Sequence, residues 1–177
     1  MSQDNPRIAV LGFAIECNRF SPVTTAEGMR AFIEVALKEQ AAGTSLPFVT
    51  IDRASGTVVG GTRFMAIERA HRRVEIGSTF LGHDWQRSAL NTEAKLLMMT
   101  HAFECWGAVR VEFKTDSRNT QSRAALARLG ATEEGYFRNH MITASGRYRH
   151  SVWFSIIDSE WPLLKQRLVH RLAGASR

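Results

Sequence analysis

Hydrophobic residues recur along the chain at two different spacings, and these spacings predict where strands and helices lie. The apolar, β-branched run at residues 7–15 predicts a strand. At residues 24–43 apolar side chains recur at helical spacing, and Thr24, with Glu27 three residues later, forms a capping box that would begin this helix. Three more predicted strands follow, at residues 46–52, 58–67 and 72–81.

The second half of the chain predicts a regular succession of helices and strands. In chain order these are a helix at 92–107, a strand at 108–116, a helix at 119–130, strands at 132–143 and 149–157, and a helix at 158–172. The strands on either side of the first of these helices should run parallel, whereas the earlier ones should be antiparallel. The pattern therefore predicts an α+β fold, with a mixed antiparallel and parallel central sheet, flanking helices and a C-terminal helix.

Length and composition narrow the class of protein. With 177 residues the chain is long enough for one domain with its own core. No apolar run approaches the ~20 residues that span a membrane, and the N-terminus lacks the pattern of a signal peptide. The two cysteines, Cys17 and Cys105, show no spacing typical of zinc ligands. We therefore expect a cytoplasmic protein with no metal site and no membrane association.

The net charge of +6 favours an anionic ligand, either nucleic acid or a phosphorylated cofactor. The basic residues of the chain occur in short, scattered groups without interleaved aromatic residues, so most of them are expected to be solvated surface charges. Nucleic acid is accordingly the least favoured ligand.

A polar segment, QRSALN at residues 86–91, stands between a predicted strand and a predicted helix. Backbone N–H groups at a helix N-terminus bind anions because the helix dipole is positive there, and Arg87 adds a cationic side chain. A pyrophosphate would suit this loop. The alternative is that the loop is only the polar start of an ordinary helix.

Three stretches in and after this loop form a longer pattern: FLGHDWQRSALNTEAKLLMMTHAF, VEFKTDSRNTQSRAALARLGATEEG, and RNHMI with the later FSIIDSEWP. Together they resemble the GNAT superfamily of acetyltransferases, and more narrowly its RimJ/RimL-like branch. The resemblance is collinear over about residues 26–172. It implies that Gln86 opens a loop that cradles the pyrophosphate of acetyl-CoA. Ala89 and Asn91 depart from the family motif, because they stand where it has a glycine and a small residue. Ala89 would be tolerated if its φ is negative, and Asn91 could cap the helix.

The resemblance further implies that the enzyme transfers an acetyl group directly from acetyl-CoA to a primary amine, without a covalent enzyme intermediate. The residues expected to contact the cofactor are Phe80, Leu81, Gln86, Arg87, Ser88, Ala89, Leu90, Asn91, Thr92, Asn119, Ser122 and Arg123. A backbone N–H near residues 79–81 would stabilise the oxyanion. The amine acceptor stays open among a protein N-terminus, an amino acid and a small metabolite.

Three side chains are candidates for proton transfer, each with a plain structural alternative. Glu75 shares a strand face with Gly77 and Thr79 by alternation, but could simply pair with a cation. His140 has an unperturbed pKa of ~6.5, suited to a base near neutrality, but could lie on a strand surface. Ser122 could protonate the leaving thiolate, but could equally bond the backbone of its helix. Lys95 and Arg123 could meet the phosphates of CoA, with a solvated surface position as the favoured alternative for both, and Cys105 is expected to be packed.

The first residues give a different prediction. The run RIAVLGFAIECNRFSPVTT resembles the start of the MlrC-like metallopeptidases. We therefore interpret residues 1–25 as an atypical segment that supplies an edge strand, and residues 26–177 as the acetyltransferase domain. Such a segment would alter one wall of the acceptor site, so a catalytically inactive acyl-CoA-binding protein is the alternative function. Exposed sheet edges could also promote a homodimer.

Overall fold

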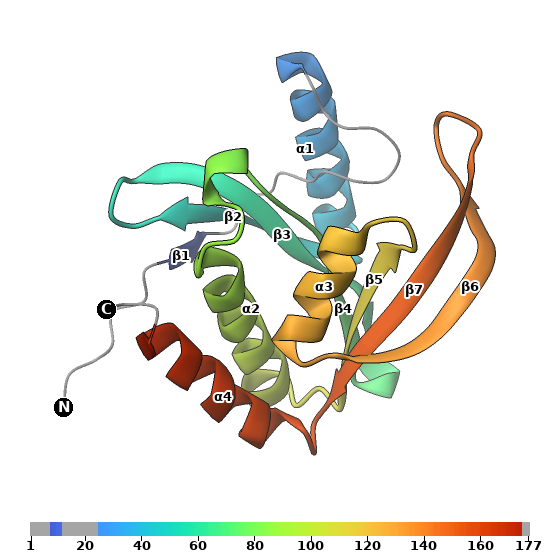
Figure 1. Ribbon diagram of the computed structural model, residues 1–177. Coiled ribbons are helices and arrows are strands. Elements are labelled where there is room, and N and C mark those ends of the chain that lie inside the picture. Colours follow the sequence, from blue (N-terminus) through green and yellow to red (C-terminus); the bar gives the residue numbers. More distant parts are fainter. Residues whose placement is uncertain (1–7, 12–24, 175–177) are drawn as a thin grey trace.

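The computed structural model describes residues 8–11 and 25–174. Its centre is a seven-stranded mixed sheet in the order β1-β2-β3-β4-β5-β7-β6 (Figure 1). The strands are β1 (Ile8–Leu11), β2 (Ser45–Asp52), β3 (Thr57–Glu68), β4 (Arg73–Leu81), β5 (Arg110–Asp116), β6 (Thr132–Ile142) and β7 (Tyr148–Ile157). The helices are α1 (Ala26–Ala41), α2 (Leu90–Thr100), α3 (Thr120–Leu129) and α4 (Trp161–Gly174). This element order and the α+β class confirm the prediction from the sequence.

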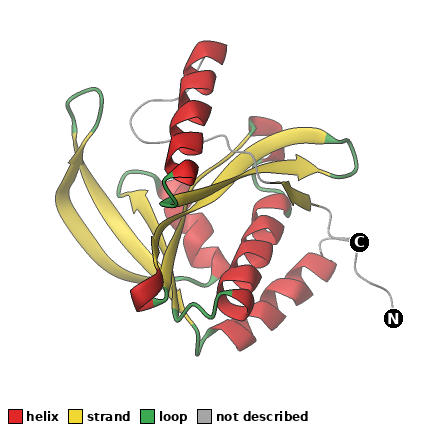
Figure 2. Cartoon of the chain, turned by 180° about the vertical axis from the view of Figure 1, so that it is seen from behind, coloured by secondary structure: helices red, strands yellow, loops and turns green. Residues whose placement is uncertain are grey.

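The helices cover the two faces of the sheet unequally (Figures 1 and 2). Alternate residues of β4, β5 and β7 point toward α2, α3 and α4, and together they form the main hydrophobic core. Met99, Val111 and Ile156 in this core are completely buried. On the other face α1 lies against β2 and β3, where Arg63 of β3 donates to Glu39 of α1. The rest of that second face, over β5, β7 and β6, carries charged side chains together with the aromatic rings of Phe137 and Trp153.

Every neighbouring pair of strands is antiparallel except β4 and β5. These two run parallel and pair only at their first residues, ending with Glu75 opposite Glu112. Beyond this point β4 and β5 have no pairing between them within the described residues, which opens the sheet along its middle. The sheet therefore splays where its one described parallel pair ends.

Two details of the predicted helices need correction. Helix α1 is capped by Thr25, whose Oγ1 accepts from the N–H of Gly28 at 3.0 Å, whereas the sequence favoured Thr24, which lies outside the described residues. Helix α2 changes at His101 into a π-helical turn, His101–Cys105. The wider turn rotates the last residues of the helix, so Cys105 is exposed and not packed as predicted.

Helix α3 matches the prediction closely because both of its ends carry clear signals. The Asn119 side chain accepts from the N–H of Ser122 at 2.9 Å and so caps the start of the helix. Gly130 ends the helix with a φ of 100°, and a Cβ there would lie 2.7 Å from Cδ1 of Leu164 in α4. Glycine is therefore required both by the left-handed turn and by the close packing of α4.

The predicted first strand is present as β1, at the edge of the sheet, antiparallel to β2. Cys17 and the rest of the segment up to residue 24 lie outside the described residues. Among the helices that the structure describes, none combines the length and the apolar character needed to cross a bilayer.

Candidate active site

A β-bulge interrupts β4 beside the opening in the sheet. Gly77 pairs with Arg63 and Phe80 pairs with Gly61, so β4 holds one residue more than β3 between these pairs. Ser78 takes the left-handed conformation, with a φ of 48°. The strands also approach closely here, because a Cβ on Gly60 would lie 2.2 Å from the carbonyl oxygen of Phe80. The bulge therefore redirects the backbone of β4 where β5 has moved away.

The bulge also corrects the predicted alternation along β4. Glu75 and Gly77 share a face, since a Cβ on Gly77 would lie 3.2 Å from Oε1 of Glu75. Thr79, by contrast, bonds to Lys95 of helix α2 on the opposite side of the sheet. The sequence placed Thr79 with Glu75 because strict alternation has no place for an extra residue.

Lys95 is buried beneath the bulge, with 4% of its surface exposed, although the sequence analysis expected it to be solvated. Its Nζ donates to Oγ1 of Thr62 at 3.0 Å and to Oγ1 of Thr79, and the two hydroxyls lie 2.9 Å apart. Burial lowers the pKa of the ammonium group to about 7. The missed signal is its helical spacing, because Met98 and Met99, three and four residues on, are both buried.

The loop before α2 has the features of an anion cradle. Arg87 has a φ of 63°, and Ala89, the residue before α2, has a φ of −67°. A left-handed residue in a tight turn can direct neighbouring N–H groups toward one concave side. Within the described residues, no acceptor is present for the N–H groups of Arg87, Ser88 and Ala89. Because the φ of Ala89 is negative, this position does not require glycine, and alanine is tolerated here.

Side chains fix the shape of this loop. Ser88 Oγ donates to the carbonyl of Trp85 at 2.6 Å and accepts from the N–H of Leu90 at 3.3 Å. Gln86 donates to the carbonyl of Leu81 at 3.2 Å. Asn91 does not cap the helix as expected, because α2 already begins at Leu90; its Oδ1 is buried and has no hydrogen-bond partner among the described residues.

The N-terminus of α3 lies beside the same loop. Gln121 Nε2 donates to Oε1 of Gln86 at 3.0 Å, which joins the two predicted cofactor-binding segments. Ser122 is half-buried in the first turn of α3, next to the Asn119 cap. Arg123 pairs with Glu133 at 3.2 Å, and both line a shallow cavity of about 300 Å³ between α3 and β6. The structure thus brings Gln86, Asn119 and Ser122 together and leaves Arg123 partly committed to Glu133.

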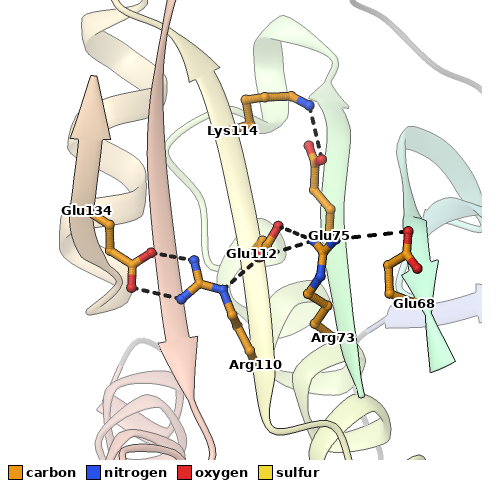
Figure 3. A network of polar contacts seen from close by, with 7 residues as sticks. All are labelled: Glu68, Arg73, Glu75, Arg110, Glu112, Lys114 and Glu134. Atoms are coloured by element: carbon orange, nitrogen blue, oxygen red, sulfur yellow. Dashed lines mark hydrogen bonds and ion pairs between the residues drawn. The ribbon is translucent and has the colours of Figure 1, made fainter. Parts of the chain in front are cut away.

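The open face of β4, β5, β7 and β6 carries a network of ion pairs, which we call the polar face (Figure 3). It consists of Arg73, Glu75, Arg110, Glu112, Lys114 and Glu134. Glu75 accepts from Lys114 at 3.2 Å, and Glu112 accepts from Arg110 at 2.7 Å. Hydrogen bonds from Arg110 lower the pKa of Glu134 to about 2. Glu75 therefore pairs with a cation, Lys114, as its structural alternative expected.

His140 lies next to this network. Its Nδ1 is 3.1 Å from Oγ of Ser151, and its ring centroid is 4.8 Å from that of Trp153. Lys114, the partner of Glu75, places its Nζ 4.9 Å above the Trp153 ring, so both candidate bases belong to one cluster. His140 is exposed on the surface of β6, as its structural alternative expected, and partial desolvation, followed by the charges of Lys114 and Arg149, lowers its pKa below the usual value. A neutral imidazole is the form that can accept a proton.

Comparison with known proteins identifies the family. The family model described as "Acetyltransferase (GNAT) domain" matches residues 3–132, which is most of the chain. The chain belongs to the GNAT family of acetyltransferases. A solved GCN5-related N-acetyltransferase from Brucella melitensis is 30% identical, with a TM-score of 0.79, over 96% of this chain and 90% of that one.

Two further GNAT relatives are more distant. RimJ from Mycobacterium smegmatis, solved in complex with CoA-disulfide, is 26% identical with a TM-score of 0.70, over 82% of this chain and 68% of that one. YdaF of Bacillus subtilis (strain 168), whose name provisionally assigns it as a ribosomal N-acetyltransferase, is 27% identical over 60% of this chain. The match spans only 57% of the length of YdaF.

The comparison does not support the interpretation of the first residues as a metallopeptidase-like segment. The GNAT match begins at residue 3 and therefore includes most of the segment that was assigned to another family. A short apolar strand followed by a polar loop is too common a pattern to identify a family. In the part of the chain that the structure describes, no cluster of three or more His, Cys, Asp or Glu residues could hold a metal ion.

Proposed function

We propose that the protein is an N-acetyltransferase that uses acetyl-CoA and transfers the acetyl group directly to a primary amine. The observation that carries this proposal is the position of the loop at residues 86–91. Its available N–H groups lie at the end of β4 that follows the bulge, where β4 and β5 have separated. The relation to a RimJ protein that was solved with a CoA compound supports the same ligand.

The proposed cofactor contacts follow from the geometry of this loop. The N–H groups of Arg87, Ser88 and Ala89, with those of the first turn of α2, would bind the pyrophosphate, and the Arg87 side chain would add positive charge. The opening between β4 and β5 would receive the extended arm of the molecule. A backbone N–H freed by the bulge near residues 79–81 would donate to the oxyanion.

We assign the general base to His140 in preference to Glu75. Acetyl-CoA supplies a thioester carbonyl that an amine attacks, and the amine must lose a proton. His140 has a lowered pKa and is held by Ser151, whereas Glu75 is occupied by Lys114. Ser122, at the start of α3 beside the loop, would protonate the departing thiolate.

The first experiment measures acetyl-CoA binding by calorimetry for the wild type and for Arg87→Glu. Arg167→Glu on α4 is the matched control, because it makes the same charge change at an exposed position. We expect micromolar binding that Arg87→Glu weakens strongly and the control retains. A folded wild type that binds no acetyl-CoA would refute the proposal.

A turnover assay then separates the enzyme from the inactive acyl-CoA-binding protein. Release of free CoA is followed with a panel of amines, with and without His140→Gln. Binding without turnover of any amine would favour the inactive protein. The inactive acyl-CoA-binding protein is the second candidate because Ala89 and Asn91 depart from the family motif in the cofactor loop.

A further inference from the structure

Arg149, on β7, is a buried cation with no ion-pair partner among the described residues. Only 7% of its surface is exposed, and its Nε is buried and lacks a hydrogen-bond partner in this part of the chain. No carboxylate in the described residues forms an ion pair with its guanidinium group. Its neighbours are already committed, because Asp116 accepts from Arg147 and Glu75 accepts from Lys114.

A largely buried charge without an ion-pair partner is costly, because little water is left to solvate it and no carboxylate pairs with it. Burial, only partly offset by the charge of Asp116, lowers the pKa of Arg149. Arginine nevertheless stays protonated in proteins near neutral pH, so the charge persists. Such a residue is expected where a ligand brings the missing negative charge, as in a bidentate arginine–carboxylate pair.

The position of Arg149 relates it to the candidate base. Arg149 and Ser151 are two residues apart on β7 and therefore point to the same face, with a separation of about 7 Å along the strand. Ser151 contacts His140, and the charge of Arg149 contributes to the low pKa of His140. One small molecule could therefore reach both side chains.

We propose that Arg149 binds a carboxylate of the acceptor, so that the substrate is an amino acid or a similar small molecule carrying both an amine and a carboxylate. The amine lies toward His140 and the carboxylate toward Arg149. This inference rests on the proposed function and narrows its acceptor. The nearby cations Lys114 and Arg147 are already paired with Glu75 and Asp116. In this part of the described face, Arg149 is therefore the cation left to receive a new anion.

The test compares amino acids with their amides, which keep the amine and lose the carboxylate. Alanine, methionine and phenylalanine are each assayed beside the corresponding amide, with wild type, Arg149→Gln and Arg149→Lys. We expect kcat/KM for the acids to exceed that for the amides by about tenfold or more, because a site built for a polar group rejects an analogue that lacks it. Arg149→Gln should remove this preference, and Arg149→Lys should retain part of it.

Arg138→Gln on β6, an exposed arginine, is the matched control and should keep the preference. Amides that react as well as the acids would overturn the inference. An equal fall in kcat/KM for the acids and the amides in Arg149→Gln would also overturn the inference, because an equal fall would indicate a structural role for Arg149. Arg149→Gln should not lower the free energy of unfolding, because it removes a buried unpaired charge.

Failure to acetylate any amine would count against the proposed function but would not test the role of Arg149. A binding measurement tests that role separately. N-acetylphenylalanine and its amide are titrated into the CoA-loaded protein by calorimetry. We expect the acid to bind more tightly to wild type than to Arg149→Gln by about tenfold. Equal affinities for the two proteins, or no binding of the acid, would overturn the role of Arg149.

Discussion

Lys95 makes the stability of the protein depend on pH in an unusual direction. Its pKa is about 7 in the folded protein, and about 10.4 in an unfolded chain. Between these values the unfolded state binds a proton that the folded state does not, so stability should rise with pH by about 1.4 kcal/mol per unit. Below about pH 7 the buried amine is charged, and this stabilisation is absent.

The expected result is a growing difference between wild type and Lys95→Met. Chemical unfolding of both proteins is measured from about pH 7.5 to about pH 9.5. Over this window the free energy of unfolding of the wild type should rise relative to that of Lys95→Met. Other titrating groups are common to both proteins and cancel in the difference. Parallel profiles would show that Lys95 is protonated or solvated in the folded state.

His140 should set the acid limb of the pH profile for acetyl transfer. The rate falls as the base becomes protonated, and because the pKa of His140 is lowered, this limb should lie below pH ~6.5. His140→Gln should abolish the limb and lower kcat by about 10²- to 10⁴-fold. Lys114→Met removes a positive neighbour and should move the limb to higher pH.

An acid limb that is unchanged in His140→Gln would assign the base elsewhere. The same measurement on Glu75→Gln separates the two candidates, since Glu75 is expected to act through its ion pair with Lys114. Glu75→Gln should therefore shift the acid limb of the pH–rate profile without removing it.

At the scale of elements, the contact between β3 and β4 at the bulge leaves no space for a side chain. Gly60→Ala would place a Cβ 2.2 Å from the backbone oxygen of Phe80, so the strands must separate. We expect a loss of about 1–3 kcal/mol of stability, as for other overpacked sites, together with weaker acetyl-CoA binding. Gly135→Ala on β6 is the matched control, since no described atom beyond its chain neighbours lies within 4 Å of the position that the new methyl group would take.

Thermal and chemical unfolding of the two variants, with acetyl-CoA titrations, provide the measurement. Equal stabilities for Gly60→Ala and Gly135→Ala would show that the close approach at the bulge is not constrained.

The elements that the sequence predicted well are those whose ends carry local signals. Asn119 and Gly130 mark α3 from both sides, and the alternating Val152, Phe154 and Ile156 mark β7. The features it missed depend on tertiary context. A serine gives no sign that it will adopt a positive φ, yet Ser78 creates the bulge that places Thr79 on the face opposite Glu75.

The candidate site shows the same division. Gln86 and Ser122 could be proposed from the sequence because each lies in a short motif at the start of a helix, although whether they bind the cofactor stays a prediction. Lys95 and Arg149 could not, because long basic side chains are usually solvated and their burial depends on strands distant in sequence. The π-helical turn at the end of α2 was not predicted either, and Cys105 within it is exposed.

For the whole molecule, the outer strand β6 leaves one edge of the sheet uncovered (Figure 1). Ile142 on this strand is 61% exposed. Because an unpaired strand edge with apolar side chains favours association, we expect a homodimer at high concentration that Ile142→Lys weakens. Sedimentation velocity checks this, with Val169→Lys on α4, where Val169 is 47% exposed, as the control. A wild type that stays monomeric at high concentration would contradict the prediction.

The brief pairing of β4 with β5 has a consequence for how the two halves of the molecule are coupled. Past Glu75 and Glu112, the inner edge of each strand lacks a strand neighbour among the described residues, so an extended molecule lying there would serve as a temporary extra strand. Amide hydrogens along both inner edges should then exchange with solvent slowly only while the molecule is bound. The bound molecule would bridge the opening between β4 and β5, and product release would leave the sheet open there again.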